Sequence, residues 1–168
     1  GENSLNYVIT NSNTAELDYQ TEEGDLFRTY YEGDGGVRLS SIWRRIAYAW
    51  EFGDINILIS GEITGDSLIQ YRREIQERVA TVAPFLLLDA DPYIVAGSER
   101  LTWIQDAYTV SDRYPYSEPS IWDDEHRMNY IRNSVKVTID AYDGALKFYV
   151  WDTSDPVILA YQKMFPKL

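Results

Sequence analysis

The sequence predicts an α+β domain, in which an antiparallel sheet of about four or five strands, built from hairpins, packs against three or so helices. In the first half of the chain, apolar residues recur every three or four positions, which indicates amphipathic helices. In the second half they alternate with polar residues, which indicates strands. Because helices and strands are segregated along the chain and do not alternate as βα units, the sheet is expected to be antiparallel.

The first predicted elements are a strand at residues 6–10, which read NYVIT, and a polar loop at residues 11–25. Three glycines follow within residues 33–36. No predicted strand leads into them and no Lys-Ser or Lys-Thr pair follows, so neither a Walker loop nor a dinucleotide-binding loop is predicted. This stretch is interpreted as a flexible segment before a helix.

That helix is predicted to begin at Ser40 or Ser41, since either serine can cap the first turn. It is predicted to end at Phe52, because Gly53 is suited to the residue after a helix. One side of the helix is apolar and is expected to face the core. Its members are Leu39, Ile42, Ile46, Ala49 and Trp50.

Residues 55–59 hold three isoleucines that alternate as in a strand, but the run is too short to exclude a buried helical turn. Both readings stay open, and the helix is favoured because Asp54 can cap it and residues 60–61, Ser-Gly, can end it. A longer helix is predicted at residues 66–83, closed by Pro84. Its apolar side comprises Leu68, Tyr71, Ile75, Val79 and Val82.

Period-two alternation predicts a hairpin at residues 93–110 with its turn at residues 96–99. A charged, proline-containing loop follows. A second hairpin is predicted within residues 132–155, where Asp143 and Gly144 form a pair typical of a two-residue primed turn. The inward side of its first strand is expected to carry Val135, Val137 and Ile139.

The last predicted element is a helix near the C-terminal end of the sequence. Ser154 or Asp155 is expected to cap it, and Pro156 is suited to its first position, where no backbone N–H is needed. Pro166 is expected to stop it. The second hairpin is therefore expected to organise the sheet and to pack against this helix.

Composition excludes several classes of function. A formal charge of −12 repels phosphate backbones and anionic lipids, so nucleic acid is not expected as a partner. The absence of cysteine excludes disulfides, thiolate metal sites and cysteine nucleophiles. No apolar run approaches the roughly 20 residues that cross a bilayer, so no direct insertion by this segment is expected. A chain of 168 residues fits a single soluble domain.

No catalytic residue, metal site or cofactor is predicted. The serine-elbow pattern GxSxG, the pattern SxxK and the zinc pattern HExxH are all absent. His126, the single histidine, stands beside three acids but has no second histidine with which to complete a zinc site. Asp89 and Asp91 have the spacing that begins a calcium loop, but the later Gly and Glu are missing, so a simple Asp-Pro turn is expected.

The best binding candidate is the loop at residues 111–119, SDRYPYSEP. Two tyrosines flank a proline that restrains the loop, and charged neighbours offer polar contacts. Rigid amphipathic tyrosines suit a protein or sugar surface. The alternative is that the tyrosines lie flat on the core with their hydroxyls in water. The candidate residues are Asp112, Arg113, Tyr114, Tyr116 and Glu118.

Four stretches carry a resemblance to a known family: GENSLNYVITN at residues 1–11, YYEGDGGVRLSSIWRRIAYAWEFGDINILIS at 30–60, DAYTVSDRYPYSEP at 106–119, and NYIRNSVKVTIDAYDGALKFYVWDTSDPVILAYQKMFP at 129–166. Together they resemble a large uncharacterised family of bacterial integral membrane proteins. Members of that family have several membrane helices in the N-terminal part and a long soluble region after them. The resemblance brings no catalytic residue.

The resemblance implies that this chain is a piece of a longer membrane protein, taken from its soluble, extracytoplasmic region. The start GENSL, with no methionine and no leader, agrees with that expectation. The expected function is a non-catalytic interaction or assembly module, whose partners are the remainder of its own membrane protein or another envelope component. The alternative is a hydrolase that acts on a cell-envelope polymer through carboxylates gathered by folding. Calcium dependence is a third hypothesis.

Overall fold

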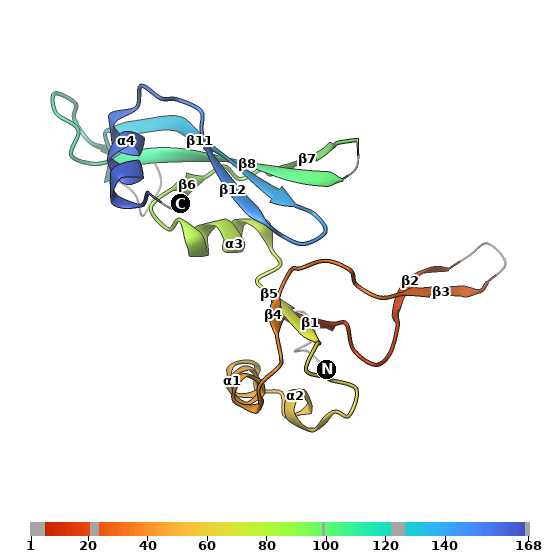
Figure 1. Cartoon of the computed structure of the whole chain (residues 1–168). Coiled ribbons are helices and arrows are strands. Elements are labelled where there is room, and N and C mark those ends of the chain that lie inside the picture. Colours follow the sequence, from red (N-terminus) through yellow and green to blue (C-terminus); the bar gives the residue numbers. More distant parts are fainter. Residues whose placement is uncertain (1–5, 21–23, 99, 122–126, 167–168) are drawn as a thin grey trace. The chain divides into compact units, whose positions relative to one another are not determined.

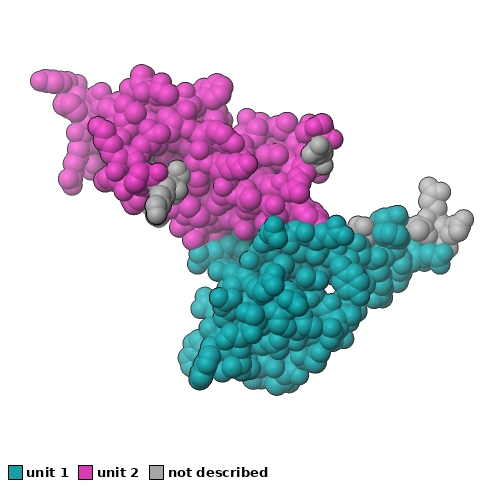
Figure 2. All heavy atoms as spheres, viewed as in Figure 1, with its two compact units in different colours: residues 1–73 teal, residues 74–168 magenta. Residues whose placement is uncertain are grey.

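The structure is a computed structural model that describes residues 6–20, 24–98, 100–121 and 127–166 (Figure 1). The chain divides into two compact units, Gly1–Arg73 and Glu74–Leu168, which Figure 2 shows in different colours. That the chain forms a single domain stays a prediction. The predicted α+β class with antiparallel sheets is confirmed.

Unit 1 contains a three-stranded antiparallel sheet in the order β1-β5-β4, two helices and a separate hairpin of β2 and β3 (Figure 1). The predicted strand at residues 6–10 is confirmed as β1, but the predicted loop at residues 11–25 is wrong, because it contains β2. Leu17 and Tyr19 alternate with polar residues in that strand, but the run is only five residues long and lies within a polar stretch. Bounds are β1 (Tyr7–Thr10), β2 (Glu16–Gln20), β3 (Leu26–Thr29), β4 (Val37–Arg38), α1 (Ile42–Phe52), α2 (Asn56–Ile59) and β5 (Leu68–Tyr71).

The ends of α1 follow the predicted capping. The Ser41 side chain accepts a hydrogen bond from the Trp43 N–H, and Gly53 ends the helix in the left-handed region with a φ of 63°. The undecided stretch at residues 55–59 is helical, which confirms the favoured reading. Asp54 contributes as expected, because its carboxylate accepts the Asn56 N–H at 2.9 Å.

The helix predicted at residues 66–83 is wrong in its first half. Residues Leu68–Tyr71 form β5, the central strand of the unit 1 sheet, and Leu68 and Ile69 are buried there. Arg72 then takes a positive φ of 51°, which interrupts any helix. The helical part, α3, begins after Glu74, whose carboxylate caps the first turn. Pairing with β1 and β4, which lie far away in the sequence, overrides the local helical pattern.

Unit 2 is built on a five-stranded antiparallel sheet in the order β12-β11-β8-β6, in which β7 also pairs with β8 (Figure 1). Both predicted hairpins are confirmed, as β7–β8 and β11–β12. Bounds are α3 (Ile75–Val82), β6 (Leu87–Leu88), β7 (Tyr93–Ala96), β8 (Leu101–Ser111), β9 (Ser120–Ile121), β10 (Arg127–Met128), β11 (Tyr130–Asp140), β12 (Leu146–Val150) and α4 (Pro156–Met164).

Helices α3 and α4 cover the same face of this sheet. The predicted inward side of β11 is confirmed, and β8 adds Ala107 to the same face, opposite Val135 in the register. The other face carries polar residues such as Lys136, which forms an ion pair with Asp106 on the neighbouring strand. The buried core comprises Val79, Ala83, Leu86, Ala107, Val135, Val137, Ile139 and Ile158.

The predicted two-residue turn between β11 and β12 is wrong. Ile139 pairs with Leu146, so the chain reverses through a longer loop in which only Gly144 has a positive φ, of 71°. A primed turn needs a positive φ at both central residues. Instead the Asp140 carboxylate accepts the N–H groups of Tyr142 and Asp143, and this bonding shapes the loop.

Helix α4 begins as predicted. Asp155 is its N-cap, accepting the Val157 N–H at 2.8 Å, and Pro156 occupies the first position. Across the described parts of the chain, no helix combines the length and the apolar composition that a membrane crossing requires.

Candidate functional site

The predicted binding loop at residues 111–119 is held in place by one side chain, that of Asn129. Its carbonyl oxygen accepts the Tyr114 N–H at 2.9 Å, and its amide group donates to the carbonyls of Tyr114 and Ser117, both at 2.7 Å. These three bonds fix the backbone of the loop relative to the start of β11. The sequence gives no local signal for this anchor, because Asn129 lies 15 residues beyond Tyr114.

The two tyrosines of this loop have different environments. Tyr114 stacks on Tyr130 with ring centroids 4.4 Å apart and an interplanar angle of 20°, so it lies against the body of unit 2. Tyr116 is fully exposed, at 107%, and has a positive φ of 66°, which is rare for a large side chain. The flat-lying alternative therefore describes Tyr114, whereas Tyr116 is presented to solvent.

The charged candidates of the loop lie on the surface beside the tyrosines. Arg113 approaches Asp112 at 3.7 Å, and both side chains are exposed. Glu118 is exposed as well. The structure brings the five predicted residues onto one loop, but none of them lines either of the two cavities described below. Their binding role stays a prediction.

The two metal hypotheses have different outcomes. Asp89 and Asp91 form the expected turn, in which the Asp89 carboxylate accepts the Asp91 N–H at 3.0 Å and the Tyr108 hydroxyl at 2.8 Å. These two hydrogen bonds lower the pKa of Asp89 below its usual value. No group of three or more potential ligands gathers within the described residues in a way that suits a metal. His126 lies outside the residues that the structure describes.

An open polar hollow of about 380 Å³ lies in unit 1. Glu32 and Asp34 line it, together with Arg38, which pairs with Asp66 at 3.1 Å. A glycoside hydrolase needs two facing carboxyl groups about 5–10 Å apart. Here both carboxylates come from one exposed loop, and no other residue that lines the hollow carries one. The hollow therefore does not favour the hydrolase alternative.

The buried carboxylate of Asp155 is the feature that sequence reasoning found only in part. Besides capping α4, it accepts hydrogen bonds from the hydroxyls of Thr109 and Ser134, both at 2.5 Å, and of Tyr130 at 2.7 Å. Burial by itself raises the pKa of Asp155, but the hydrogen bonds from Ser134, Thr109 and Tyr130 outweigh it and lower the pKa below the usual value. This carboxylate ties β8, β11 and α4 together, which is a structural role.

An unexpected apolar surface lies on α1 and α2. The sequence predicts that Ile42, Ile46 and Trp50 face the core, and this is wrong, because all three are exposed. The prediction is confirmed for Leu39 and Ala49, which are buried, and Phe52 stacks on Tyr7 with ring centroids 4.7 Å apart. We call the exposed set the tryptophan face. It comprises Ile42, Trp43, Ile46, Trp50, Ile55 and Ile59.

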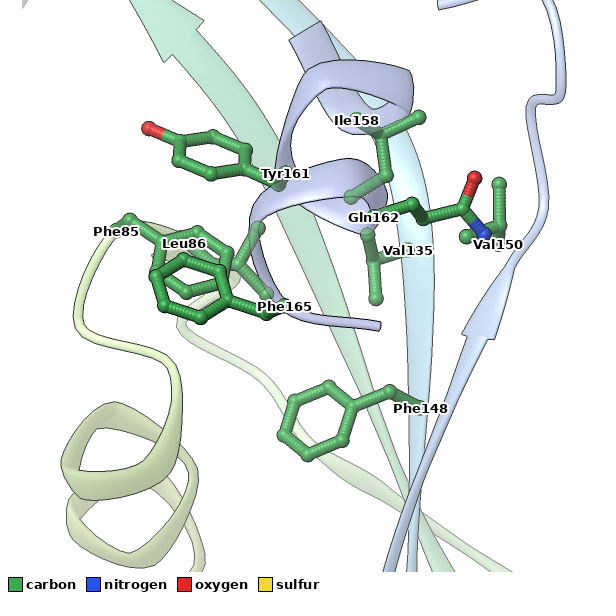
Figure 3. A pocket seen from close by; sticks show the side chains of 9 residues that line it. All are labelled: Phe85, Leu86, Val135, Phe148, Val150, Ile158, Tyr161, Gln162 and Phe165. Carbon is green, nitrogen blue, oxygen red and sulfur yellow. The ribbon is translucent and has the colours of Figure 1, made fainter. Parts of the chain in front are cut away.

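A small apolar cavity of about 110 Å³ lies in unit 2 between α4 and the sheet (Figure 3). Phe148 and Val150 of β12 form one wall, and Ile158 and Phe165 contribute from α4 and the residue after it. Gln162 and a tyrosine supply the polar groups of the lining, and Figure 3 shows the Gln162 carboxamide beside Val150. The cavity suits an apolar group with a polar group beside it.

Comparison with known proteins identifies relatives along the whole chain. The model of the uncharacterised protein family UPF0182 matches residues 1–168. UPF0182 proteins of Trichodesmium erythraeum and of a Sulfurovum species are each 48% identical and cover 100% of this chain, but only 20% and 18% of those proteins is matched. One from Methanospirillum hungatei is 47% identical, with 100% and 19% covered. The chain thus spans about a fifth of the length of these relatives. No solved structure matches it.

Proposed function

The chain belongs to the uncharacterised protein family UPF0182, and from this premise we propose that it is a non-catalytic interaction module of a longer membrane protein. Its docking surface is the tryptophan face, and the partner is another segment of the same longer polypeptide. In this proposal the module lies on the extracytoplasmic side of the membrane. The observation that carries the proposal is the exposure of the tryptophan face.

The exposure of this face is unusual for a surface that meets only water. Trp43 is 76% exposed and Trp50 is 89% exposed, although both belong to a well-capped helix with an otherwise buried side. Exposed apolar surfaces mark interaction sites in soluble proteins, and tryptophan contributes strongly to binding energy when a partner covers it. The pattern of α1 therefore fits a helix that packs on the core of unit 1 with one side and on a partner with the other.

The charge of this region favours an apolar partner surface. Residues 42–59 contain two basic residues, Arg44 and Arg45, and two acidic ones, Glu51 and Asp54, which sum to zero. The whole chain carries −12, so the acidic charge lies elsewhere. A neutral, tryptophan-rich surface is not built for ionic attraction, and binding there would be driven by apolar burial.

The length of the relatives favours a partner within the same polypeptide. Four-fifths of each of these relatives lies outside the part that this chain matches. A segment of the same polypeptide is present at a high effective concentration, so even a modest apolar surface is sufficient for stable docking. A second copy of the chain and a lipid surface are the competing occupants, and the experiment separates them.

The test uses the ¹⁵N-labelled chain and the remainder of the Trichodesmium erythraeum relative, held in phosphatidylcholine nanodiscs. We expect the indole N–H signals of Trp43 and Trp50 to shift on mixing, and the Trp43→Ser/Trp50→Ser variant to weaken binding at least tenfold. Trp151→Ser is the matched control, because Trp151 is a 72% exposed tryptophan of unit 2 and its loss should change nothing.

Three outcomes would contradict the proposal. Equal shifts with empty nanodiscs would assign the face to lipid, and a concentration-dependent dimer that the double variant loses would assign it to a second copy. No shift at millimolar concentration would remove docking altogether. The membrane side is tested separately by a protease-accessible tag placed within the chain of the full-length protein in intact cells, where only an extracytoplasmic tag is cleaved.

A further inference from the structure

Strand β12 lies at the edge of the five-stranded sheet of unit 2. Among the described residues it pairs only with β11, in an antiparallel register that matches Val135 with Val150 and Ile139 with Leu146. An edge strand presents unpaired backbone N–H and C=O groups, which form a ready template for a further strand. The edge of β12 is therefore a candidate surface for an added strand.

The backbone groups that point to this open edge can be assigned. At the two ends of the hairpin, the Asp140 N–H donates to the Ala145 carbonyl, and the Trp151 N–H donates to the Ser134 carbonyl. Hydrogen bonding alternates along an antiparallel strand, so residues at even steps from Ala145 direct their backbone to β11. The N–H and C=O groups of the intervening residues point outward. These residues are Leu146, Phe148 and Val150.

The same strand forms a wall of the apolar cavity. The side chains of Phe148 and Val150 point to the face that α4 covers, where Ile158 and Phe165 complete the cavity (Figure 3). A strand added beside β12 would place every second side chain on this face. A dry cavity of about 150 Å³ holds a benzene molecule. The cavity of about 110 Å³ is smaller, so it suits a branched aliphatic side chain.

Charge around this edge differs from that of the chain as a whole. The only charged side chains of β12 and α4 are Lys147 and Lys163, both exposed, although the chain carries −12. Asp152, which follows β12, pairs with Arg132 at 3.0 Å. The Asp155 carboxylate is buried and accepts hydrogen bonds inside the core. An added strand with acidic residues on the Lys147 side would find a complementary charge.

We propose that the edge of β12 binds an extended segment of the longer polypeptide as an added strand, with a Leu, Ile or Val side chain in the cavity and an acidic residue beside Lys147. Main-chain hydrogen bonds to Phe148 and Val150 give the affinity, and the cavity gives the selectivity. The proposal shares with the proposed function only the source of the partner. It uses a different surface, in unit 2.

The test uses twelve-residue peptides that tile the Trichodesmium erythraeum relative outside the part that this chain matches. Binding is followed by chemical shifts of the ¹⁵N-labelled chain. We expect peptides with alternating aliphatic and acidic residues to shift the amides of Leu146, Phe148 and Val150. Val150→Pro removes an outward N–H without touching the β11 pairing, which an edge strand tolerates, and should weaken binding at least tenfold.

Ile94→Pro is the matched control. Ile94 lies on β7, another edge strand, and β7 contributes no residue to the cavity, so binding should change less than twofold. A second measurement needs no variant of the protein. N-methylation of the alternate peptide residues whose N–H groups face β12 should abolish binding, whereas N-methylation of their neighbours should preserve it. Lys147→Glu should weaken the binding of acidic peptides about tenfold.

Several results would overturn the proposal: no peptide binding at millimolar concentration, shifts confined to residues away from β12 and α4, or equal binding of both N-methylated series. Dimerisation of the chain through β12 would also overturn it, in favour of a second copy. The Trp43→Ser/Trp50→Ser variant should bind the peptides normally. If that variant still bound the nanodisc-held remainder normally, the proposed function would fail while the strand proposal would stand.

Discussion

The two units bury their apolar residues in different ways. In unit 2, α3 and α4 cover one face of a five-stranded sheet, and the alternating residues of β11 are almost completely buried. In unit 1, the buried core is small, and two helices leave six large apolar residues on the surface. The core of unit 1 consists of Leu39, Ala49, Ile57 and Ile69.

This difference shows what an amphipathic pattern means. Both α1 and β11 have a regular apolar side, yet only β11 has a partner within its unit that covers it. Tertiary neighbours, and not the pattern, decide whether such a side becomes a core or a surface. Under the proposed function, the exposed apolar side of α1 is the side that a partner would cover.

The largest expected effect contrasts one isoleucine from each unit. Ile139→Ala, in the core of unit 2, should lower the free energy of unfolding by about 2–5 kcal/mol, because it leaves a cavity. Ile46→Ala, on the tryptophan face, should change it by less than about 0.5 kcal/mol. Hydrogen exchange of amides within each unit measures both values. A large loss for Ile46→Ala in the isolated chain would contradict the comparison.

The second prediction concerns the polar interior of unit 2. Asp155→Ala removes the acceptor for the hydroxyls of Thr109, Ser134 and Tyr130 and the cap of α4. We expect a loss of about 2–4 kcal/mol, since buried donors are left without partners and a helix cap is lost. Urea unfolding followed by tryptophan fluorescence measures it. Asp155→Asn, which keeps the cap, should cost less; an equal cost would mean that the cap is unimportant.

The smallest expected effect concerns unit 1 at high pH. Burial, together with the hydrogen bond to Asp54 at 2.5 Å and the charge of that carboxylate, raises the pKa of Tyr7 to about 12. Because the folded pKa exceeds the unfolded value of 10.0, the stabilisation is complete below pH 10 and is lost as the pH rises toward 12. The free energy of unfolding of Tyr7→Phe should depend less on pH in this range than that of the unsubstituted chain. Absorbance at the tyrosinate band follows the ionisation. An unchanged pH dependence would exclude this role of Tyr7.

The sequence predicted those parts of the fold that local chemistry controls. The caps Ser41, Gly53 and Asp155 lie next to the helices that they end, so their positions can be read from a few neighbouring residues. The alternation along β11 and β12 likewise identifies each strand and its buried side. The binding role of the five candidate residues in the loop at 111–119 stays a prediction, and the anchoring role of Asn129 was not predicted.

The errors concern residues whose environment depends on distant segments. Leu68–Tyr71 fits a helical pattern as well as a strand, and only its position between β1 and β4 makes it β5. The partners of Asp155 lie 21 to 46 residues away, so nothing around Ser154 or Pro156 indicates a buried network. The cavity between β12 and α4 likewise joins segments that are separate in the sequence.

By itself, the sequence determined the α+β class, the hairpins of unit 2 and the ends of α1 and α4, because alternation and capping act over a few residues. The tertiary structure alone decided that β5 is a strand, that Asp155 is enclosed by hydroxyls and that Trp43 and Trp50 face outward. Burial depends on which surfaces meet in space, and that information is spread over the whole chain.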